Sequence, residues 1–525
     1  MTQLPPVFGV SANRRLGWST ALVLALAGGA HALSLAWPFA RGLEPGQPVA
    51  WLQLAAMTTL VWQLQRCQGA RQAAWAAWLF ATAMLAGTFW WLFNSMHFYG
   101  GLPAPLAVLA VLLLAAALAL YYALAGALYA AWRPASPWVG AFLFAACWLL
   151  AELARVRLFT GFPWGESGYA HVDGWAKPLA GWIGVHGLSW LAALWAAAVA
   201  ACLLRSAPQR WLLVAGLVLL AGGLAALPAP VAQPLPQPPL TLTLVQGNIA
   251  QDEKFVPGQG VADALRYYGE QLAQARSSLV VLPETAIPVL PGQLPPGYWR
   301  AIEARFAQGE QAALIGMPWG EPDLGYTNSV LGIKPGAEQA YRYDKHHLVP
   351  FGEFIPPLFK WFVRMMNIPL GGFNRGAVGQ ASMEWQGHRL APNICYEDLF
   401  GEELGVRFAD PQTAPTVFVN LSNIAWFGNT VAIDQHLHIS RMRALEFARP
   451  MVRATNTGAT VVINAHGQVT HALPRHTRGV LEAQVQGTQG LSPYARWVSV
   501  LGLWPWLALG LATLIIAWWV QRRRQ

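Results

Sequence analysis

The sequence predicts a polytopic α-helical membrane bundle of eight spans together with one α/β domain. Its 525 residues are 55% hydrophobic but only 11% charged, and 27 of them are tryptophan. Soluble chains carry about twice that share of charge, so a bilayer must serve as part of the solvent. Residues 240–490 have a different sequence pattern, because short β-rich runs alternate there with helical segments. A wholly soluble or disordered protein is excluded.

Eight apolar segments are long enough to cross a bilayer, at about 20 residues per crossing. No Asp, Glu, Lys or Arg lies between Arg71 and Arg133, between Lys177 and Arg205, or between Arg210 and Asp252. We therefore predict seven transmembrane helices within residues 1–230, and an eighth with a basic tail within residues 491–525. The predicted spans cover residues 17–38, 46–65, 72–95, 104–131, 136–155, 179–204, 211–230 and 498–520.

The basic residues beside these spans predict their orientation, because Lys and Arg next to a span tend to stay in the cytoplasm. Most basic flanks fall on one side of an alternating path: Arg14 and Arg15, Arg66 and Arg71, Arg133, Arg205 and Arg210, and Arg522 to Arg524. Both termini should then be cytoplasmic, with residues 240–490 outside. The alternative is that residues up to Ala30-His31-Ala32 form a cleaved signal peptide. Removal of the first span would change the number of crossings, and the alternating path would no longer place these basic flanks on the cytoplasmic side.

The net charge of +9 belongs to the membrane part of the chain. Residues 240–490 hold 21 of the 25 acidic residues and 19 of the 34 basic residues, so their own net charge is −2. A basic excess beside apolar spans indicates membrane topology rather than affinity for nucleic acid. We expect a membrane-embedded protein with no nucleic-acid partner.

A proline-rich linker at residues 231–239 separates the first seven spans from the domain at residues 240–490. Period-two alternation and β-branched residues predict strands near residues 240–245, 278–282, 313–317, 416–421 and 460–463. Helical candidates between them cover residues 261–275, 298–307 and 436–448. About 250 residues of alternating strand and helix imply one α/β domain with a packed core.

Cys395 is the one cysteine of this domain, since Cys67, Cys147 and Cys202 lie in or beside spans. A lone thiol outside the cytoplasm is open to oxidation, so it is either a small buried apolar residue or a functional one. Residues 389–395 are typical of a strand that ends at the thiol. A side chain on a sharp turn after a strand is exposed at the sheet edge, where a following backbone N–H can meet an oxyanion.

Two further segments bring reactive side chains to strand ends. Val280-Val281-Leu282-Pro283-Glu284 places a carboxylate after an apolar strand, and residues 344–353 place Lys345 among aromatic and apolar residues. Each segment alone is weak evidence for a functional site, because a single Glu or Lys is usually a solvated surface group. Glu284, Lys345 and Cys395 follow one another at intervals of 61 and 50 residues.

In this order and spacing, the three residues resemble the catalytic triad of the nitrilase superfamily. That resemblance implies an α-β-β-α sandwich, in which Glu284 is the general base, Lys345 stabilises the oxyanion and Cys395 forms a thioester. With the spans included, the chain resembles the apolipoprotein N-acyltransferase family. The matching segments are residues 161–164, 245–249, 283–288, 345–353, 394–397, 425–428 and 441–446.

The family resemblance also implies supporting or substrate-binding roles for further residues: Glu353, Tyr396, Glu397, Trp164, Trp426 and Phe255. Glu353 should hold the lysine, and Tyr396 and Glu397 should shape the pocket. Two positions depart from the family pattern. Phe255 stands where the family has Trp, and it can still pack against lipid. Ile424 replaces the aspartate of Ser-Asn-Asp-Ala-Trp-Phe-Gly, which argues against a catalytic role at that position.

The resemblance implies a bacterial inner-membrane enzyme with its catalytic domain on the periplasmic side. It would move an acyl chain from a phospholipid, at the sn-1 ester of phosphatidylethanolamine, through the Cys395 thioester to diacylglyceryl-cysteine on apolipoproteins. Transfer from ester through thioester to amide runs downhill overall and needs no ATP, and the sequence has no Gly-x-x-x-x-Gly-Lys-Ser/Thr loop. No cofactor and no metal are expected, since the adjacent His346 and His347 point in different directions.

Two other functions stay open on the residues alone. A membrane-anchored amidase could hydrolyse small amides and use its helices as a tether, although one helix would suffice for that. A transporter or channel predicts ionisable residues inside the spans, and residues 72–132 contain no acid, Lys or Arg. The apolar segment Phe354–Phe373 is either a lid that dips into lipid or a core helix.

Overall fold

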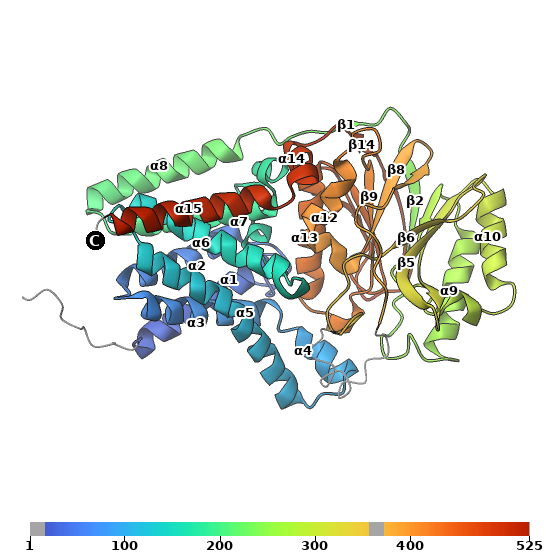
Figure 1. The fold of residues 1–525 in the computed structure, drawn as a ribbon. Coiled ribbons are helices and arrows are strands. Elements are labelled where there is room, and N and C mark those ends of the chain that lie inside the picture. Colours follow the sequence, from blue (N-terminus) through green and yellow to red (C-terminus); the bar gives the residue numbers. More distant parts are fainter. Residues whose placement is uncertain (1–15, 356–371, 524–525) are drawn as a thin grey trace, which may run out of the picture.

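The structure is a computed structural model that describes residues 16–355 and 372–523. A helical bundle and an α/β domain lie side by side (Figure 1). The segment Phe354–Phe373, expected to be a lid or a core helix, lies almost wholly outside the described residues. The long helices of the bundle are α1 (Trp18–Leu35), α2 (Ala50–Arg66), α3 (Ala70–Thr88), α5 (Ala104–Trp132), α6 (Pro137–Arg157), α7 (Ala180–Leu203), α8 (Ala207–Ala225) and α15 (Trp504–Arg522).

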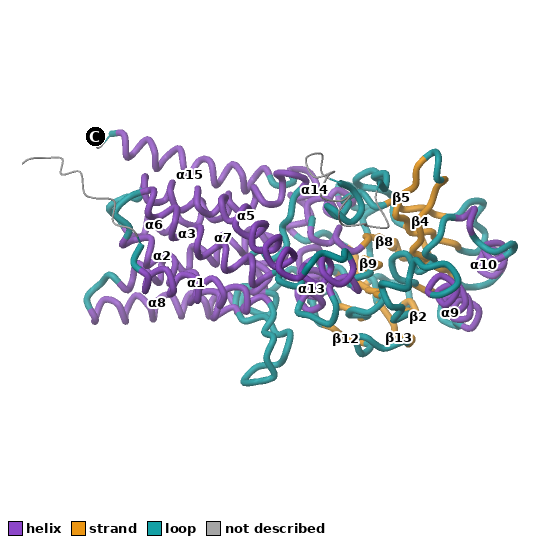
Figure 2. Tube along the Cα trace, turned by 90° about the horizontal axis from the view of Figure 1, so that it is seen from below, coloured by secondary structure: helices purple, strands orange, loops and turns teal. Residues whose placement is uncertain are grey.

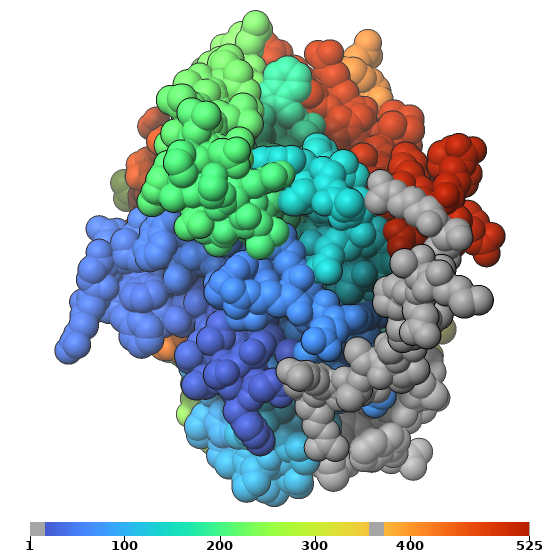
Figure 3. Space-filling model, turned by 90° about the vertical axis from the view of Figure 1, so that its left-hand side faces the viewer, coloured from blue at the N-terminus to red at the C-terminus, as the bar shows by residue number. Residues whose placement is uncertain are grey.

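The bundle helices carry apolar residues on their outer as well as their inner faces, which is typical of helices surrounded by lipid. Leu109, Leu113 and Leu120 of α5 are about half exposed, and α8 has no buried residue. Seen from the end opposite the α/β domain, α8 (green) and the C-terminal helix (red) lie on the outside of the bundle (Figure 3). The exposed apolar surface fits a membrane protein.

Within the described residues, six helices are long and apolar enough to span a membrane. A seventh is obtained if the bent pair of α3 and residues 92–99 is counted as one span, while α2 has only 17 residues. Helices occur at all eight predicted places, but the count of eight spans remains a prediction.

Three predicted spans are interrupted in the structure, and one of them, residues 179–204, is kinked within α7 at Gly184, whose φ is 66°. The predicted helix 72–95 ends at Thr88 and turns by 63° into α4 (Leu92–Asn94) and η1 (Ser95–Tyr99). At this bend Trp91 donates to the Thr88 carbonyl and to Gln435 of the α/β domain, so a tertiary contact overrides local hydropathy. The predicted span 498–520 is divided at Gly502, whose φ of 54° suits glycine, into α14 (Pro493–Leu501) and α15.

The α/β domain contains two six-stranded sheets. The strand orders are β13-β2-β3-β4-β5-β6 and β12-β11-β10-β9-β8-β7. The first sheet comprises β2 (Leu240–Gln246), β3 (Leu279–Val281), β4 (Ala312–Glu321), β5 (Gly325–Ile333), β6 (Tyr341–Asp344) and β13 (Gly479–Val485). The second comprises β7 (Met383–Trp385), β8 (His388–Ile394), β9 (Val417–Ser422), β10 (Met451–Thr455), β11 (Val461–Ile463) and β12 (Val469–Ala472).

The two sheets pack face to face between layers of helices. Alternate residues of both sheets, such as Leu242 and Val281 of one and Val419 and Val452 of the other, form one buried core. The helices α9 (Gly260–Gln274) and α10 (Tyr298–Gln308) cover the first sheet, while α12 (Gly401–Gly405) and α13 (Ala432–Phe447) lie beside the second (Figures 1 and 2). The predicted strands and helices of residues 240–490 are thereby confirmed, apart from shifts at their ends.

The bundle and the α/β domain share a continuous buried interface. The buried residues of α13 and α14 belong to the same apolar cluster as those of α6 and α7. Polar groups fix the position of the two parts relative to each other, because Glu446 of α13 accepts a hydrogen bond from the Val185 N–H of α7 at 2.7 Å. The proline-rich linker also crosses between the parts, and its short strand β1 (Gln233–Pro234) pairs with β14 (Thr488–Gln489). The α/β domain is therefore held in a defined position against the bundle.

Candidate active site

Glu284 lies three residues beyond strand β3, as the apolar run that precedes it predicts. Its Oε1 accepts hydrogen bonds from Lys345 Nζ at 3.1 Å and from Asn328 Nδ2 at 2.8 Å. Its Oε2 accepts from the Asn423 N–H at 2.8 Å. The side chain is buried, so these donors fix the carboxylate in one orientation.

Lys345 directly follows strand β6 and is fully buried between two carboxylates. Its ammonium donates to Glu353 Oε1 at 2.9 Å as well as to Glu284. Burial alone disfavours the charged form, but the carboxylates of Glu284 and Glu353 outweigh it and raise the pKa of the Lys345 ammonium. The lysine therefore carries a permanent positive charge inside the site. Glu353 contacts the lysine as expected, and its Oε2 also accepts from the Val349 N–H.

Cys395 is the first residue after strand β8 and opens the short helix η7 (Cys395–Leu399). Its φ of 51° is a left-handed conformation that costs a non-glycine residue energy and sets the thiol on a sharp turn. Burial, and then the charge of Glu284, raise the pKa of the Cys395 thiol to about 12, although Lys345 opposes this. The thiol is therefore protonated at neutral pH and needs a base before it can attack.

The three residues come from three strand ends and meet at one edge of the sandwich. Glu284 and Lys345 follow strands of the first sheet, and Cys395 follows a strand of the second. Glu284 and Lys345 are in contact, and both act electrostatically on the Cys395 thiol. A buried acid and a buried ammonium next to a partly exposed thiol can perform nucleophilic acyl transfer with proton transfer.

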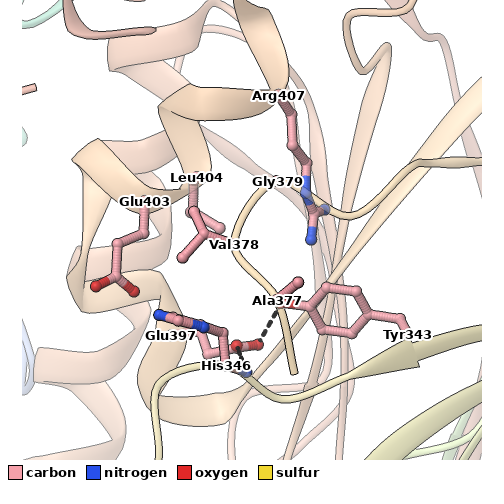
Figure 4. A pocket seen from close by; sticks show the side chains of 9 residues that line it. All are labelled: Tyr343, His346, Ala377, Val378, Gly379, Glu397, Glu403, Leu404 and Arg407. Atoms are coloured by element: carbon pink, nitrogen blue, oxygen red, sulfur yellow. Dashed lines mark hydrogen bonds between the residues drawn. The ribbon is translucent and has the colours of Figure 1, made fainter. Parts of the chain in front are cut away.

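Glu397 ties the cysteine turn to the lysine loop, in agreement with the expectation that it shapes the site. Its Oε1 accepts from the N–H groups of His346 and His347, and its Oε2 accepts from the Ile394 N–H and the Tyr343 hydroxyl. Figure 4 shows this carboxylate at the side of a small pocket next to Tyr343 and His346. Four hydrogen bonds to one buried carboxylate fix Cys395 relative to Lys345.

The remaining predicted residues lie around the triad. Tyr396 is buried, and its hydroxyl donates to the Gly161 carbonyl of the bundle at 3.1 Å. Trp164 is 3% exposed and donates to Gln435 of α13 at 2.8 Å. Trp426 and Phe255 are partly exposed; the first packs against Tyr99, and the second lies beside Lys254. In this structure Trp164 joins the bundle to the α/β domain, and its contact with substrate remains a prediction.

Several buried polar residues of the site were not predicted from the sequence. Asn328 donates to both Glu284 and Glu353, and Asn423 donates its N–H to Glu284. Lys254 donates to the Glu284 carbonyl and to the Thr285 hydroxyl. Behind the cysteine, His436 contacts the Cys395 carbonyl and Asp398. One sequence signal could have identified such residues: a polar residue that stands inside or just after an apolar strand segment, such as Asn328 in β5.

His346 and His347 are adjacent histidines that could suggest a metal site. Among residues 16–355 and 372–523, no group of three or more His, Cys, Asp or Glu side chains is placed to hold a metal ion. His346 instead contacts the Gly376 carbonyl, and His347 contacts Glu403 and the Thr160 carbonyl. Both histidines therefore make ordinary structural contacts.

Comparison with known proteins assigns both regions of the chain. Residues 29–198 match the family described as apolipoprotein N-acyltransferase N-terminal domain, and residues 241–491 match carbon-nitrogen hydrolase. An apolipoprotein N-acyltransferase of Verminephrobacter eiseniae is 58% identical over 93% of this chain and 94% of that protein. The chain belongs to the apolipoprotein N-acyltransferase family. Similar proteins of that name from Ralstonia nicotianae and Bordetella bronchiseptica are 44% and 43% identical, over 90% and 93% of this chain and 90% and 95% of their own.

Membership of this family identifies the chain as an enzyme of the nitrilase superfamily that is fused to membrane helices. The nitrilase-type domain holds every one of the converging residues, since Glu284, Lys345 and Cys395 fall within residues 241–491. The N-terminal domain contributes the loop at residues 158–164, which contacts Tyr396 and His347. Relatives of this name align along nearly the whole chain, so the two domains occur together in them.

The Glu397→Gln variant tests the positioning role of this carboxylate. A glutamine has one acceptor oxygen, so it cannot satisfy four buried donors, and the loss should destabilise the enzyme by about 1–3 kcal/mol. Displacement of the cysteine turn should lower the rate of acyl-enzyme formation about 100-fold. Thermal unfolding and rapid-quench acylation measure the two effects. The matched control is Glu384→Gln, whose carboxylate is exposed on β7, and equal behaviour of the two variants would contradict the assigned role.

Proposed function

We propose that this enzyme transfers an acyl chain from a phospholipid to the α-amino group of diacylglyceryl-cysteine on apolipoproteins, through a thioester on Cys395. The convergence of Glu284, Lys345 and Cys395 beside an apolar bundle supports this proposal most strongly. The names of the relatives, apolipoprotein N-acyltransferase, supply the acceptor class. The donor is proposed to be phosphatidylethanolamine, cleaved at its sn-1 ester.

In the first half-reaction, Glu284 accepts the proton of the Cys395 thiol. The sulfur then attacks the ester carbonyl carbon, and the carbonyl oxygen becomes a tetrahedral oxyanion. When this intermediate collapses, the bond between the carbonyl carbon and the glycerol oxygen breaks. The proton on Glu284 passes to that oxygen, so lysophospholipid leaves and the acyl thioester remains.

In the second half-reaction, the neutral α-amino group of the acceptor attacks the thioester carbon. Glu284 accepts a proton from this nitrogen as the amide forms, and the bond between carbon and sulfur breaks. The proton then returns to the sulfur, and the free Cys395 thiol is regenerated. The cycle has a ping-pong order and uses no cofactor.

The oxyanion in both half-reactions needs donors that are already in place. Lys345 supplies a permanent positive charge, because two carboxylates keep its ammonium protonated. The backbone N–H near Tyr396, just after the sharp turn at Cys395, is the proposed second donor. Glu353 holds the lysine, and Asn328 holds both carboxylates.

Transfer instead of hydrolysis requires that water be kept from the thioester. A long acyl chain contributes about 0.8 kcal/mol for each buried methylene, so binding at an apolar face is strongly favoured. Phe255 and Trp426, both partly exposed, are proposed to contact substrate. Trp164 is proposed to close the floor of the site, since it packs against Trp91, Phe427 and His436.

We place the protein in the inner membrane of a bacterium with eight spans. Residues 1–230 would provide seven spans, 231–239 the linker, 240–490 the periplasmic catalytic domain, and 491–525 the eighth span and its cytoplasmic tail. Arg133 lies next to the end of α2, where it donates to the Leu64 carbonyl. The C-terminus and the start of α8 lie at the end of the bundle away from the sandwich (Figure 1). This clustering of basic flanks supports cytoplasmic termini.

Labelling of engineered cysteines tests this orientation. A membrane-impermeant maleimide should label Gln339→Cys in intact spheroplasts and should label Gln209→Cys only after the membrane is opened. Both positions are exposed, so each is open to reagent once it is reached. The chain without either substitution serves as the control for its own four cysteines. Labelling of position 209 alone in intact spheroplasts would reverse the topology.

An acceptor assay separates the proposed transferase from a membrane-anchored amidase. Purified enzyme in phospholipid nanodiscs is given a diacylglyceryl-cysteine peptide or a set of small aliphatic amides. We expect N-acylated peptide and lysophospholipid in equal amounts, and no ammonia from the amides. Release of ammonia without peptide acylation would support the amidase and contradict the transferase.

A further inference from the structure

Lys254 is a second buried lysine beside the triad. It lies on the loop after strand β2 and is 1% exposed. Its ammonium donates to the Glu284 carbonyl at 3.2 Å and to the Thr285 hydroxyl at 2.7 Å. Lys254 also interacts electrostatically with the Glu284 carboxylate and with Cys395. A lysine is rarely buried unless it is paired or functional, and the mechanism above does not use this one.

The contacts of Lys254 hold the backbone that aims the general base. Thr285 has a φ of 47°, a conformation that a β-branched residue adopts only when its surroundings impose it. By binding the carbonyl before this residue and the hydroxyl on it, the ammonium stabilises the turn that follows Glu284. The direction of the Glu284 carboxylate depends on this turn.

The same loop reaches Glu284 by a second route. Gln251, three residues before Lys254, accepts a hydrogen bond from the Asn423 side chain at 2.8 Å. The N–H of Asn423 in turn donates to Glu284 Oε2. The base is therefore held through its backbone by Lys254 and through its carboxylate by Asn423, and both are tied to residues 251–254.

The charge of the site also favours a second cation. Glu284 and Glu353 bring two negative charges against the one positive charge of Lys345. After Glu284 has taken the thiol proton, the oxyanion restores the second negative charge. A protonated Lys254 would offset it without displacing Lys345. Burial lowers the pKa of Lys254 to about 7, against the raising effect of Glu284 and Cys395, and the oxyanion replaces the Glu284 charge that protonation removes, so the protonated form of Lys254 stays favoured.

We propose that Lys254 is a positioning residue of the acyl-transfer reaction, which fixes the Glu284–Thr285 turn and supplies a second positive charge to the site. This inference rests on the proposed function of the triad. It assigns to the loop after β2 a role in forming the acyl-enzyme. The groups that face Lys254 are Glu284, from the β3 end, and Cys395, from the β8 end.

The test compares Lys254→Met and Lys254→Gln in the full-length enzyme in phosphatidylethanolamine nanodiscs. Both variants should form the acyl-enzyme about 100-fold more slowly than the unmodified enzyme. Loss of the cation disfavours the thiolate of Cys395, so the pH–rate profile of acylation should move to higher pH. Lys334→Met is the matched control, because Lys334 donates to the Glu384 carbonyl and lies outside the site.

The outcomes distinguish this inference from the proposed function. Slower acylation with a shifted profile, at an unchanged melting temperature, supports the inference. Acylation within twofold of the unmodified enzyme overturns it, while the triad stands if Cys395→Ala remains inactive. An unshifted profile in a variant that melts earlier shows a merely structural lysine and also overturns it. If Lys254→Met does not fold, Lys254→Gln, which keeps hydrogen-bond donors, decides by the same criteria. Full activity of Cys395→Ala would instead contradict the proposed function.

Discussion

Replacement of Glu284 by Gln is expected to lower the rate of acyl-enzyme formation by about 10³–10⁴-fold, which is the upper range for loss of a general base. Burial and neighbouring negative charge raise the pKa of the Cys395 thiol to about 12. At pH 7.5 very little thiolate therefore exists without a base that accepts the proton. Glutamine keeps the size of the side chain but cannot accept that proton.

Rapid mixing of the Glu284→Gln enzyme with phospholipid, followed by mass measurement of the intact protein, determines this rate. The matched control is Glu321→Gln, which changes an exposed carboxylate at the end of β4. Part of the loss in Glu284→Gln should return above pH 9, where more of the thiol ionises without help. A rate within tenfold of the unmodified enzyme at pH 7.5 would show that another group accepts the proton.

The Lys345→Met variant is expected to lose both stability and activity. The substitution leaves the Glu284 and Glu353 carboxylates buried without their cation, which costs about 3–5 kcal/mol. Loss of the positive charge at the oxyanion should lower acylation about 10³-fold. Thermal unfolding and the acylation rate are measured on the same preparation.

The stability deficit of Lys345→Met should change with pH in a defined direction. Without Lys345, two like charges are buried side by side, and uptake of a proton by the folded protein relieves their repulsion. A group with a raised pKa binds protons more tightly in the folded state, so the stability deficit of Lys345→Met should shrink as pH falls from 8 to 5.

A double variant separates stability from catalysis. Lys345→Met with Glu353→Gln removes one of the two unpaired charges, so it should unfold at a higher temperature than Lys345→Met alone. The acylation rate should stay low, because the cation is still missing. Recovery of acylation together with stability would show that Lys345 is only a structural residue.

Much of the catalytic domain could be predicted because its local patterns agree with its fold. The alternation at residues 240–245 and the apolar runs before Glu284 and Cys395 predict strands that the structure contains. Parallel strands place their carboxyl ends at one edge of a sheet, so residues after those ends are brought together. Cys395 follows a strand of the second sheet, so its place beside Glu284 and Lys345 was predicted only through the resemblance to the nitrilase triad.

The parts that could not be predicted depend on contacts between distant residues. Trp91 turns α3 aside by binding Gln435, which lies 344 residues further along the chain. Asn328 and Lys254 contact Glu284 from 44 and 30 residues away, and the segments around them do not indicate which residue they contact. The division between α14 and α15 at Gly502 interrupts an apolar run that hydropathy treats as continuous. Such features follow from tertiary packing, which overrides local preference.

Mass spectrometry of the Cys395 peptide tests the central claim most directly. The enzyme is incubated with phosphatidylethanolamine that carries a distinct chain at sn-1, then digested under acidic conditions that preserve thioesters. We expect the mass of the sn-1 acyl group on the Cys395 peptide and its disappearance after addition of a diacylglyceryl-cysteine peptide. Absence of this adduct, together with full N-acylation by Cys395→Ala, would contradict the account.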